Sequence, residues 1–245
     1  MTNITRRLCL LTSAQILALF LVASTCQAQE SNAATEALRE AKRLTSEGKY
    51  EEALQKHLWY HEHATEIDPH QSGVRVSFAL THWVDLGKKY PQALDALKSV
   101  RDQGAARLLK GEGDWSLLYD VYSIDKELGE SQATVELFKK IDAANPSFAA
   151  EVYHGADRAL LDAKEYALVS EYMPDTSEQL ATAQKLFEMN RKLMGAANAE
   201  RRFADAMIRL ITVLKETGDR QRALEIQAQA LKVVDSPQIR EAVKP

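Results

Sequence analysis

A short pattern centred on glycine recurs along this chain and constrains its fold more than any other feature. In each copy, a glycine is followed about five residues later by a small residue, and then by leucine or valine. Each copy follows one apolar stretch with helical spacing and opens another. Such repetition indicates a chain built from similar structural units. The four copies are Gly48–Leu54, Gly87–Leu94, Gly129–Val135 and Gly218–Leu224.

The physical basis of this pattern is a helical hairpin. Glycine adopts the left-handed backbone conformation that ends a helix without steric cost, because it has no Cβ atom. The small residue that follows lets the second helix pack closely against the first. A proline then marks the end of the second helix at Pro69, Pro146 and Pro237, since proline cannot continue a helix. All six prolines of the chain fall at boundaries between expected helices.

Hydrophobic spacing and composition both favour an all-α fold. The chain has only 10 glycines and 6 prolines among its 245 residues, and no stretch shows the sustained alternation expected of a strand. Near the C-terminus one apolar stripe recurs at helical intervals, and polar residues such as Arg209 and Lys215 fall outside it. This stripe consists of Ala204, Met207, Ile208, Ile211 and Leu214.

The spacing of these residues resembles that of the tetratricopeptide repeat (TPR), a helix–turn–helix unit of 34 residues. The agreement is best over 204–237, where Gly218, Ala223 and Pro237 lie at or near the family's key positions, and it is fair over 115–146. Together the matching segments cover about two thirds of residues 29–245. The resemblance implies an all-α fold of stacked antiparallel helical hairpins that form a TPR-like right-handed α-solenoid.

The pattern departs from the family in several places, and a generic helical-repeat bundle is the alternative. The second helix is about one turn too long in the first copy, and Gly87 comes one residue early in the second. The stretch 147–195 fits poorly, although Ala163–Tyr166 has the composition of a degenerate turn. The expected repeats are 34–69, 74–104, 115–146, 147–174 and 177–237.

The resemblance also implies that the chain binds a protein or peptide in a concave groove lined by the first helix of each hairpin. The lysines among the implied groove residues would hold a peptide carboxylate, whereas the simpler interpretation makes them solvated surface residues. Nucleic acid is not an expected partner, because 31 Lys+Arg stand against 35 Asp+Glu. The implied groove residues are Lys42, Phe78, His82, Asp85, Tyr119, Lys126 and Lys215.

Residues 1–28 have the layout of a secretory signal peptide. Arg6 and Arg7 precede an apolar run over 8–23, and small residues then lead to Ala28, after which we expect cleavage. Residues 29–245 would form a single TPR-like helical-repeat domain, exported to the periplasm or secreted, with no stable membrane span. Because none of the asparagines after residue 28 begins a usable glycosylation sequon, a bacterial envelope is the favoured location; these asparagines are Asn32, Asn145, Asn190 and Asn198.

Two alternatives to this cleavage stay open. An uncleaved segment would anchor the chain in a membrane, although its strongest apolar core is somewhat short for a span. Cys26 would instead carry a lipid anchor, but the preceding residue is Thr25 where Gly, Ala or Ser is expected. Cleavage after Ala28 removes both cysteines, so no disulfide is expected, and the loss of Arg6 and Arg7 changes the net charge from −4 to −6.

No sequence signature of an enzyme is present. The chain has neither a Gly-x-Ser-x-Gly motif nor a glycine-rich phosphate loop. Cleavage leaves no cysteine nucleophile, and the many carboxylates are of the kind that solvate helix surfaces. We therefore expect a non-catalytic interaction scaffold of the cell envelope that carries no cofactor.

A cluster of histidines supports the competing hypothesis, an extracytoplasmic helical protein that handles zinc or copper or is enzymatic. Five of the six histidines lie between His57 and His82. His57 and His61 are four residues apart, the spacing that lets two imidazoles on one helix reach one metal ion. The simpler interpretation places His57 in the core, where the TPR family has a packing aromatic, and the other histidines on the surface. We expect no metal site and name His57 and His61 as the candidates.

Overall fold

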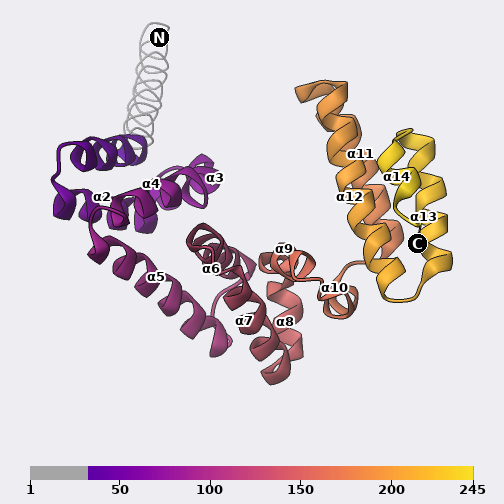
Figure 1. Ribbon diagram of the computed structural model, residues 1–245, viewed down its shortest axis with the longest axis horizontal. Coiled ribbons are helices and arrows are strands. Elements are labelled where there is room, and N and C mark those ends of the chain that lie inside the picture. Colours follow the sequence, from indigo (N-terminus) through magenta and orange to yellow (C-terminus); the bar gives the residue numbers. More distant parts are fainter. Residues whose placement is uncertain (1–32, 245) are drawn as a thin grey trace, which may run out of the picture. The chain divides into compact units, whose positions relative to one another are not determined.

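The computed structural model describes residues 33–244, and every regular element in this range is a helix (Figure 1). The expected all-α class is confirmed for these residues. No helix in this range is both long enough and apolar enough to cross a membrane. The expected signal peptide, its cleavage after Ala28 and the lipidation alternative at Cys26 lie outside the described residues.

The chain divides into two compact units. Within the described residues, the first comprises residues 33–106 together with Ser123–Glu130, and the second comprises Arg107–Tyr122 together with residues 131–244. Helix α6 (Trp115–Leu128) contributes to both units.

The first unit is built from short helical hairpins. A helix covers residues 33–46 and is followed by α2, which packs against α3 and α4. The core of this unit surrounds Trp83, whose indole N–H donates a hydrogen bond to the carbonyl oxygen of Ala93 at 2.8 Å. The further elements are α2 (Tyr50–Ile67), η1 (Pro69–Gln71), α3 (Ser72–Arg75), α4 (Phe78–Gly87) and α5 (Pro91–Leu109).

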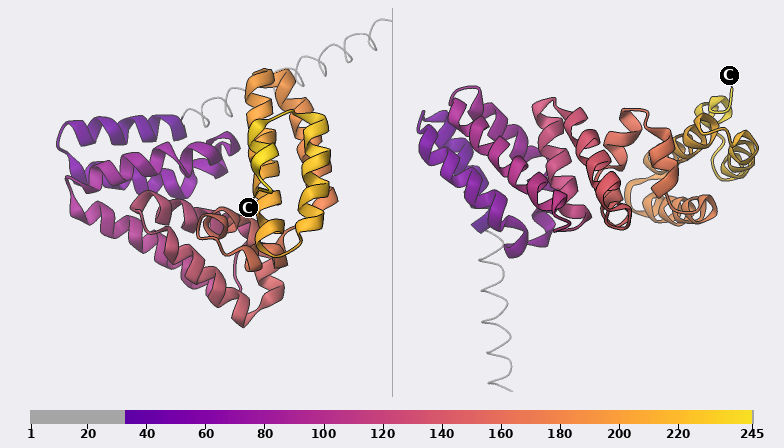
Figure 2. Two further views of the ribbon diagram at one scale, coloured as in Figure 1. Left: turned by 45° about the vertical axis from the view of Figure 1, so that its right-hand side comes forward. Right: turned by 90° about the horizontal axis from the view of Figure 1, so that it is seen from below.

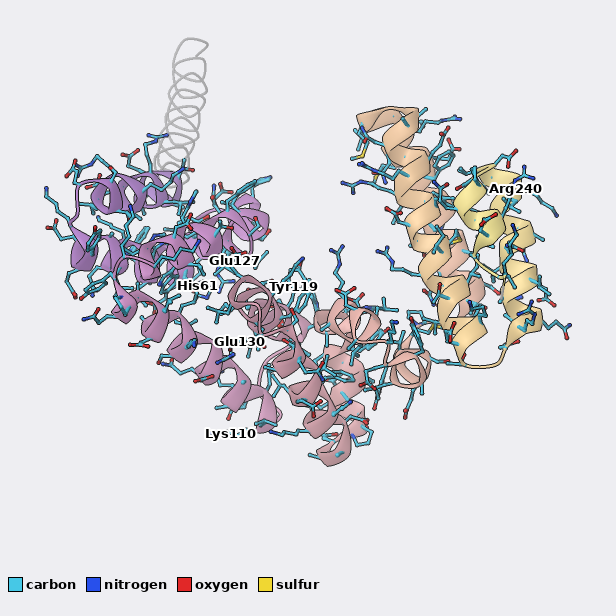
Figure 3. All side chains as sticks on the ribbon, viewed as in Figure 1. His61, Lys110, Tyr119, Glu127, Glu130 and Arg240 are labelled. Atoms are coloured by element: carbon cyan, nitrogen blue, oxygen red, sulfur yellow. The ribbon has the colours of Figure 1, made fainter. Side chains whose placement is uncertain are left out.

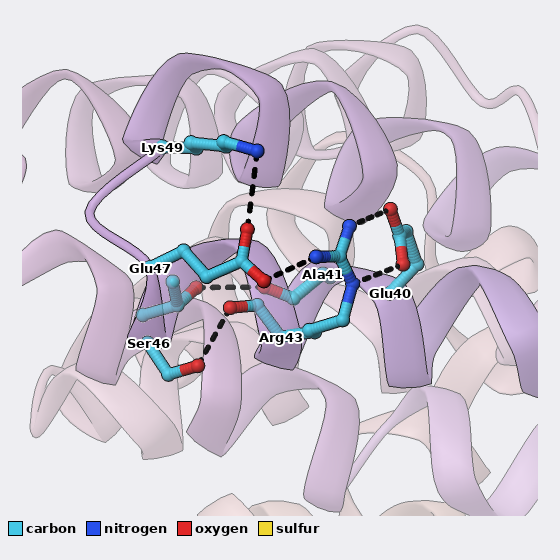
Figure 4. A network of polar contacts seen from close by, with 7 residues as sticks. Glu40, Ala41, Arg43, Ser46, Glu47 and Lys49 are labelled. Carbon is cyan, nitrogen blue, oxygen red and sulfur yellow. Dashed lines mark hydrogen bonds and ion pairs between the residues drawn. The ribbon is translucent and has the colours of Figure 1, made fainter.

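Two groups of ion pairs lie in this unit. Asp125 is 1% exposed and pairs with Arg101, which also reaches Glu130 at 3.1 Å (Figure 3). On the helix at 33–46, Arg43 bridges Glu40 and Glu47, one turn before and one turn after it (Figure 4). The first pairing is mostly buried and holds α5 to α6, whereas the second is exposed and contributes little to stability.

The second unit contains α12, which with 21 residues is the longest helix in the part of the chain that the structure describes (Figure 2). Two successive hairpins, α11–α12 and α12–α13, share the helix α12. The elements after α6 are α7 (Ser131–Ala144), α8 (Pro146–Val152), η2 (Tyr153–Gly155), α9 (Asp157–Asp162), α10 (Tyr166–Tyr172), α11 (Thr176–Met194), α12 (Ala196–Glu216), α13 (Arg220–Val233) and α14 (Pro237–Glu241).

The apolar stripe expected near the C-terminus forms the buried face of α12. Met207, Ile211 and Leu214 are at most 4% exposed, and they pack with Ile226 and Ala230 of α13. Three aromatic rings connect α7, η2 and α10. The rings of Phe138, Tyr153 and Tyr172 contact one another, with centroids 5.5 to 6.2 Å apart.

Five turns between helices have the same backbone hydrogen bonds, and one of them is at Gly111, where φ is 76° and the N–H of Glu112 donates to the carbonyl of Arg107 at 3.0 Å. At Gly48, Gly129 and Gly218, φ is 78°, 75° and 91°, and the next residue's N–H donates to the carbonyl five residues before it at 2.7 to 2.9 Å. Lys164 makes the same turn with a φ of 60°, and Glu165 donates to Leu160 at 2.9 Å. The degenerate turn expected at Ala163–Tyr166 is therefore present, with lysine in the position that glycine takes elsewhere.

Two details of the glycine pattern differ from expectation. The backbone of Gly87 is not in the left-handed conformation, because this residue is the last of α4 and has helical backbone. A Cβ atom at this position would lie 2.3 Å from Cγ of Leu94. This glycine therefore serves close helix packing. In the third copy the buried small residue is Thr134, at 0% exposure, and Ala133 is exposed. The first, second and fourth copies bury Ala53, Ala93 and Ala223 completely, as expected.

Candidate functional site

The histidines of the metal hypothesis lie in the first unit, where two of them contact one tryptophan. His57 is 1% exposed, and its ring stacks on Trp83 with the centroids 5.6 Å apart. The ring of His61 meets the same indole at a steep angle, with centroids 5.9 Å apart. The interpretation of His57 as a core residue is therefore confirmed.

Burial lowers the pKa of both histidines. The pKa of His57 falls to about 4, chiefly through burial and secondly through the charge of His82. The pKa of His61 falls to about 3, again chiefly through burial, with a further contribution from Arg75. Nη2 of Arg75 lies 3.1 Å from Nε2 of His61 (Figure 3). Both rings are therefore neutral near pH 7.

The neighbouring histidines have other contacts. His63 packs against Trp59 with ring centroids 5.3 Å apart, and Nδ1 of His70 lies 3.0 Å from the carboxylate of Asp68. Within residues 33–244, no three side chains of the metal-binding types gather closely enough to hold an ion. The structure thus places His57 and His61 in packing contacts around one indole.

Five of the implied groove residues belong to the first unit. Phe78 is 68% exposed, Lys42, Asp85 and Lys126 are exposed, and His82 is half-buried. Burial lowers the pKa of His82, the charge of Lys42 lowers it further, and the charge of Asp85 raises it. Asp85 also forms an ion pair with Lys88 at 2.7 Å.

Tyr119 and Lys215 belong to the second unit. Tyr119 is half-buried and its ring lies 6.0 Å from that of Tyr122, centroid to centroid. Lys215 is half-buried and pairs with Glu216 at 3.3 Å. The assignment of all seven residues to one binding groove stays a prediction.

A groove with a volume of about 640 Å³ opens along α11 and α12, in the second unit. It begins at α9 and at the proline between α10 and α11, and both long helices provide its walls. Its lining combines apolar side chains with arginines, carboxylates and amides. The lining residues are Arg158, Pro174, Glu178, Gln179, Thr182, Ala183, Leu186, Phe187, Asn190, Arg202, Phe203, Asp205, Ala206 and Arg209.

The floor of this groove is apolar because the two helices meet there. Phe187 of α11 and Phe203 of α12 are at most 8% exposed, and their ring centroids are 5.6 Å apart. Ala183 and Ala206 line the same floor.

Three arginines lie along the groove: Arg158 of α9 and Arg202 and Arg209 of α12. All three are exposed. In the part of the chain that the structure describes, none of them forms a side-chain hydrogen bond or an ion pair. Glu178 and Asp205 also line the groove, so its lining carries three positive and two negative formal charges.

A smaller recess of about 300 Å³ adjoins this groove and shares Arg158, Gln179 and Arg209 with it. Asp157 lies in this recess, and burial raises the pKa of its carboxyl group. The backbone N–H of Arg158 and the charges of Arg158 and Arg209 offset part of that rise. At the α9 end of the groove, the partly buried carboxyl group of Asp157 therefore lines the same recess as Arg158 and Arg209.

The sequence interpretation missed this groove, although one signal for it was present. Arg202 and Arg209 are seven residues apart, which places them on one face of α12, and Arg209 lies outside the apolar stripe. Arg158 belongs to α9, and the sequence around it does not predict that it lies beside Arg202 and Arg209. The hollow itself depends on how α11 packs against α12, which periodicity does not show.

Comparison of the chain with models of known protein families finds no match, and comparison with curated proteins finds none either.

Proposed function

We propose that this chain is a non-catalytic interaction scaffold of the cell envelope, a TPR-like α-solenoid that binds a peptide or protein segment in a groove. The observation that carries the proposal is the groove along α11 and α12, with an apolar floor and three arginines that form no side-chain hydrogen bond or ion pair within the described residues. Binding sites combine an apolar surface with a few polar groups that orient the ligand. The groove has both.

The turns support the TPR-like part of the proposal. The same left-handed turn occurs at Gly129 and at Lys164, which are 35 residues apart in the sequence, close to the 34-residue period of the family. The completely buried small residues Ala53, Ala93, Thr134 and Ala223 fall where each second helix must approach the first. A repeating turn combined with a repeating close contact is what stacked hairpins require.

Export is the part of the proposal that comes from sequence alone. The basic start, the apolar run over 8–23 and the small residues up to Ala28 support it. Intact-mass measurement of the protein from an envelope fraction tests it. We expect a chain that begins at Gln29, and retention of Met1 would contradict export with cleavage.

Site-specific photo-crosslinking in the expressing cell tests the binding function. A photoreactive amino acid replaces Thr182, which is exposed and lines the groove, or Lys232, which is exposed on α13 outside it. We expect a discrete crosslinked product from position 182 and none from position 232. The product should disappear when Arg202→Glu and Arg209→Glu are added, because these changes reverse the charge along the groove.

Two results would contradict the proposal. One is the absence of any crosslinked product at position 182 when the protein is folded, as shown by its helical circular dichroism. The other is a product that forms equally at both positions, since that would report random collisions rather than binding in the groove.

A further inference from the structure

The α11–α12 hairpin exposes more apolar surface than the groove floor. On α11, Leu186, Met189 and Leu193 are 46%, 48% and 73% exposed. They are three and four residues apart, so they form one stripe along the helix. Leu186 also lines the groove. The apolar floor therefore continues toward the end of α11 as an exposed apolar strip.

The walls of this groove are two helices that lie side by side (Figures 1 and 2). They are consecutive in sequence and are joined at Gly195, which has a φ of 84°. From Gln179 to Leu193 the α11 wall rises about 21 Å, at 1.5 Å per residue. A helix of about four turns matches this length, and a furrow between two helices is a surface on which amphipathic helices dock.

The charges along α12 favour one spacing of acidic residues in the ligand. Arg202 and Arg209 are two helical turns apart, about 10 Å along the axis, and Asp205 lies between them on the same groove face. A bound helix gains from a carboxylate beside each arginine and loses from a carboxylate beside Asp205. Acidic residues seven positions apart meet both conditions. Acidic residues four positions apart bring one carboxylate next to Asp205.

We propose that this groove binds an acidic amphipathic helix, which sets two carboxylates two turns apart against Arg202 and Arg209 and buries its apolar face on Leu186 and Phe187. The inference rests on the proposed function, because it names the partner of the same groove. Arg158, at the α9 end, pairs with a further acidic residue of the bound helix. The exposed Met189 adds a flexible apolar contact at the other end.

Two synthetic 18-residue helical peptides of identical composition test the inference. Both carry a leucine face, and their two glutamates stand either seven or four positions apart along one edge of it. Fluorescence anisotropy measures their binding to the purified exported protein. We expect the peptide with the seven-residue spacing to bind about tenfold more tightly, a difference of about 1.4 kcal/mol.

Variants of the protein provide the matched control. Arg202→Glu with Arg209→Glu should weaken binding of the better peptide at least about tenfold. Lys185→Glu with Lys192→Glu makes the same change in net charge on exposed residues of α11 that do not line the groove, and should leave binding nearly unchanged. A peptide with lysines in place of the two glutamates should bind the arginine-reversed variant better than it binds the original protein.

Several outcomes would overturn the inference. If the two peptides bind equally, the groove does not select the spacing of the glutamates. If the two variants lose equal affinity for the better peptide, the attraction is a general effect of charge. If crosslinks at position 182 form while neither peptide binds, the groove binds a ligand other than this helix. The proposed function would then stand, and the inference about the helix would be wrong. If both experiments fail, both proposals are wrong. Binding to phosphatidylglycerol vesicles that only the arginine reversal abolishes, without peptide binding, would assign the face to a lipid surface.

Discussion

The ring of His57 stacks on the indole of Trp83 with the two centroids 5.6 Å apart, and neither ring nitrogen of His57 has a hydrogen-bond partner. A buried polar group without a partner costs free energy, so this contact is tolerable only while the ring is neutral. Protonation would place a charge in a buried position, which burial disfavours. His61 borders the same indole and has the guanidinium of Arg75 beside it.

We therefore predict that stability falls with pH in the acid range. The unfolded chain takes up a proton on His57 below about pH 6.5, whereas the folded chain resists it until about pH 4. Stability is thus complete above pH 6.5 and is lost progressively down to pH 4, by about 1.4 kcal/mol per pH unit for this group. Urea unfolding between pH 7.5 and pH 4.5 measures the slope.

His57→Phe keeps a packing ring and removes the titration, so its unfolding free energy should depend less steeply on pH. His70→Gln changes an exposed histidine outside this core and should retain the original slope. An unchanged slope in His57→Phe would show that the stacked imidazole does not cause the acid sensitivity.

Lys164→Gly should stabilise the protein. Lys164 has a φ of 60° at a turn where the four other copies have glycine, and a residue with a Cβ atom costs about 1 kcal/mol in this conformation. The larger flexibility of unfolded glycine offsets part of the gain. Lys140→Gly, at an exposed position inside α7, should instead cost about 1 kcal/mol. Thermal unfolding of both variants checks this; a loss of stability in Lys164→Gly would contradict the argument.

Ala223→Leu should destabilise the last hairpin by roughly 1 to 3 kcal/mol, because overpacking forces neighbouring side chains out of their preferred conformations. Ala223 is 0% exposed, at the close contact between α13 and α12. Ala228 is exposed on the same helix, so Ala228→Leu should change stability by less than about 0.5 kcal/mol. Equal shifts in melting temperature for the two variants would show that the hairpin register is wrong.

Zinc and a chelator are expected to leave the melting temperature unchanged. A metal ion would have to draw both imidazoles away from Trp83, and a structural zinc site requires four ligands. Calorimetry of the purified protein with zinc or with EDTA measures this. A drop of several degrees in EDTA that is absent in His57→Ala/His61→Ala would support the metal hypothesis instead.

The helices and most of the turns between them follow from local sequence, because they depend on residues close together in the chain. The spacing of Met207, Ile211 and Leu214 predicted the buried face of α12, and Gly48, Gly129 and Gly218 marked turns that require a left-handed residue. Even the degenerate turn at Lys164 was visible as a break between two helical patterns.

Which side chains meet across helices depends on how the helices pack. Arg158 joins Arg202 and Arg209 because α9, α11 and α12 pack around one hollow, and no local pattern encodes that packing. Helix packing also determines that Thr134, and not Ala133, fills the close contact. Adjacent residues point about 100° apart around the helix axis, so only one of the two faces the neighbouring helix. Periodicity assigns a face to each helix, but only the packed neighbours determine what that face contacts.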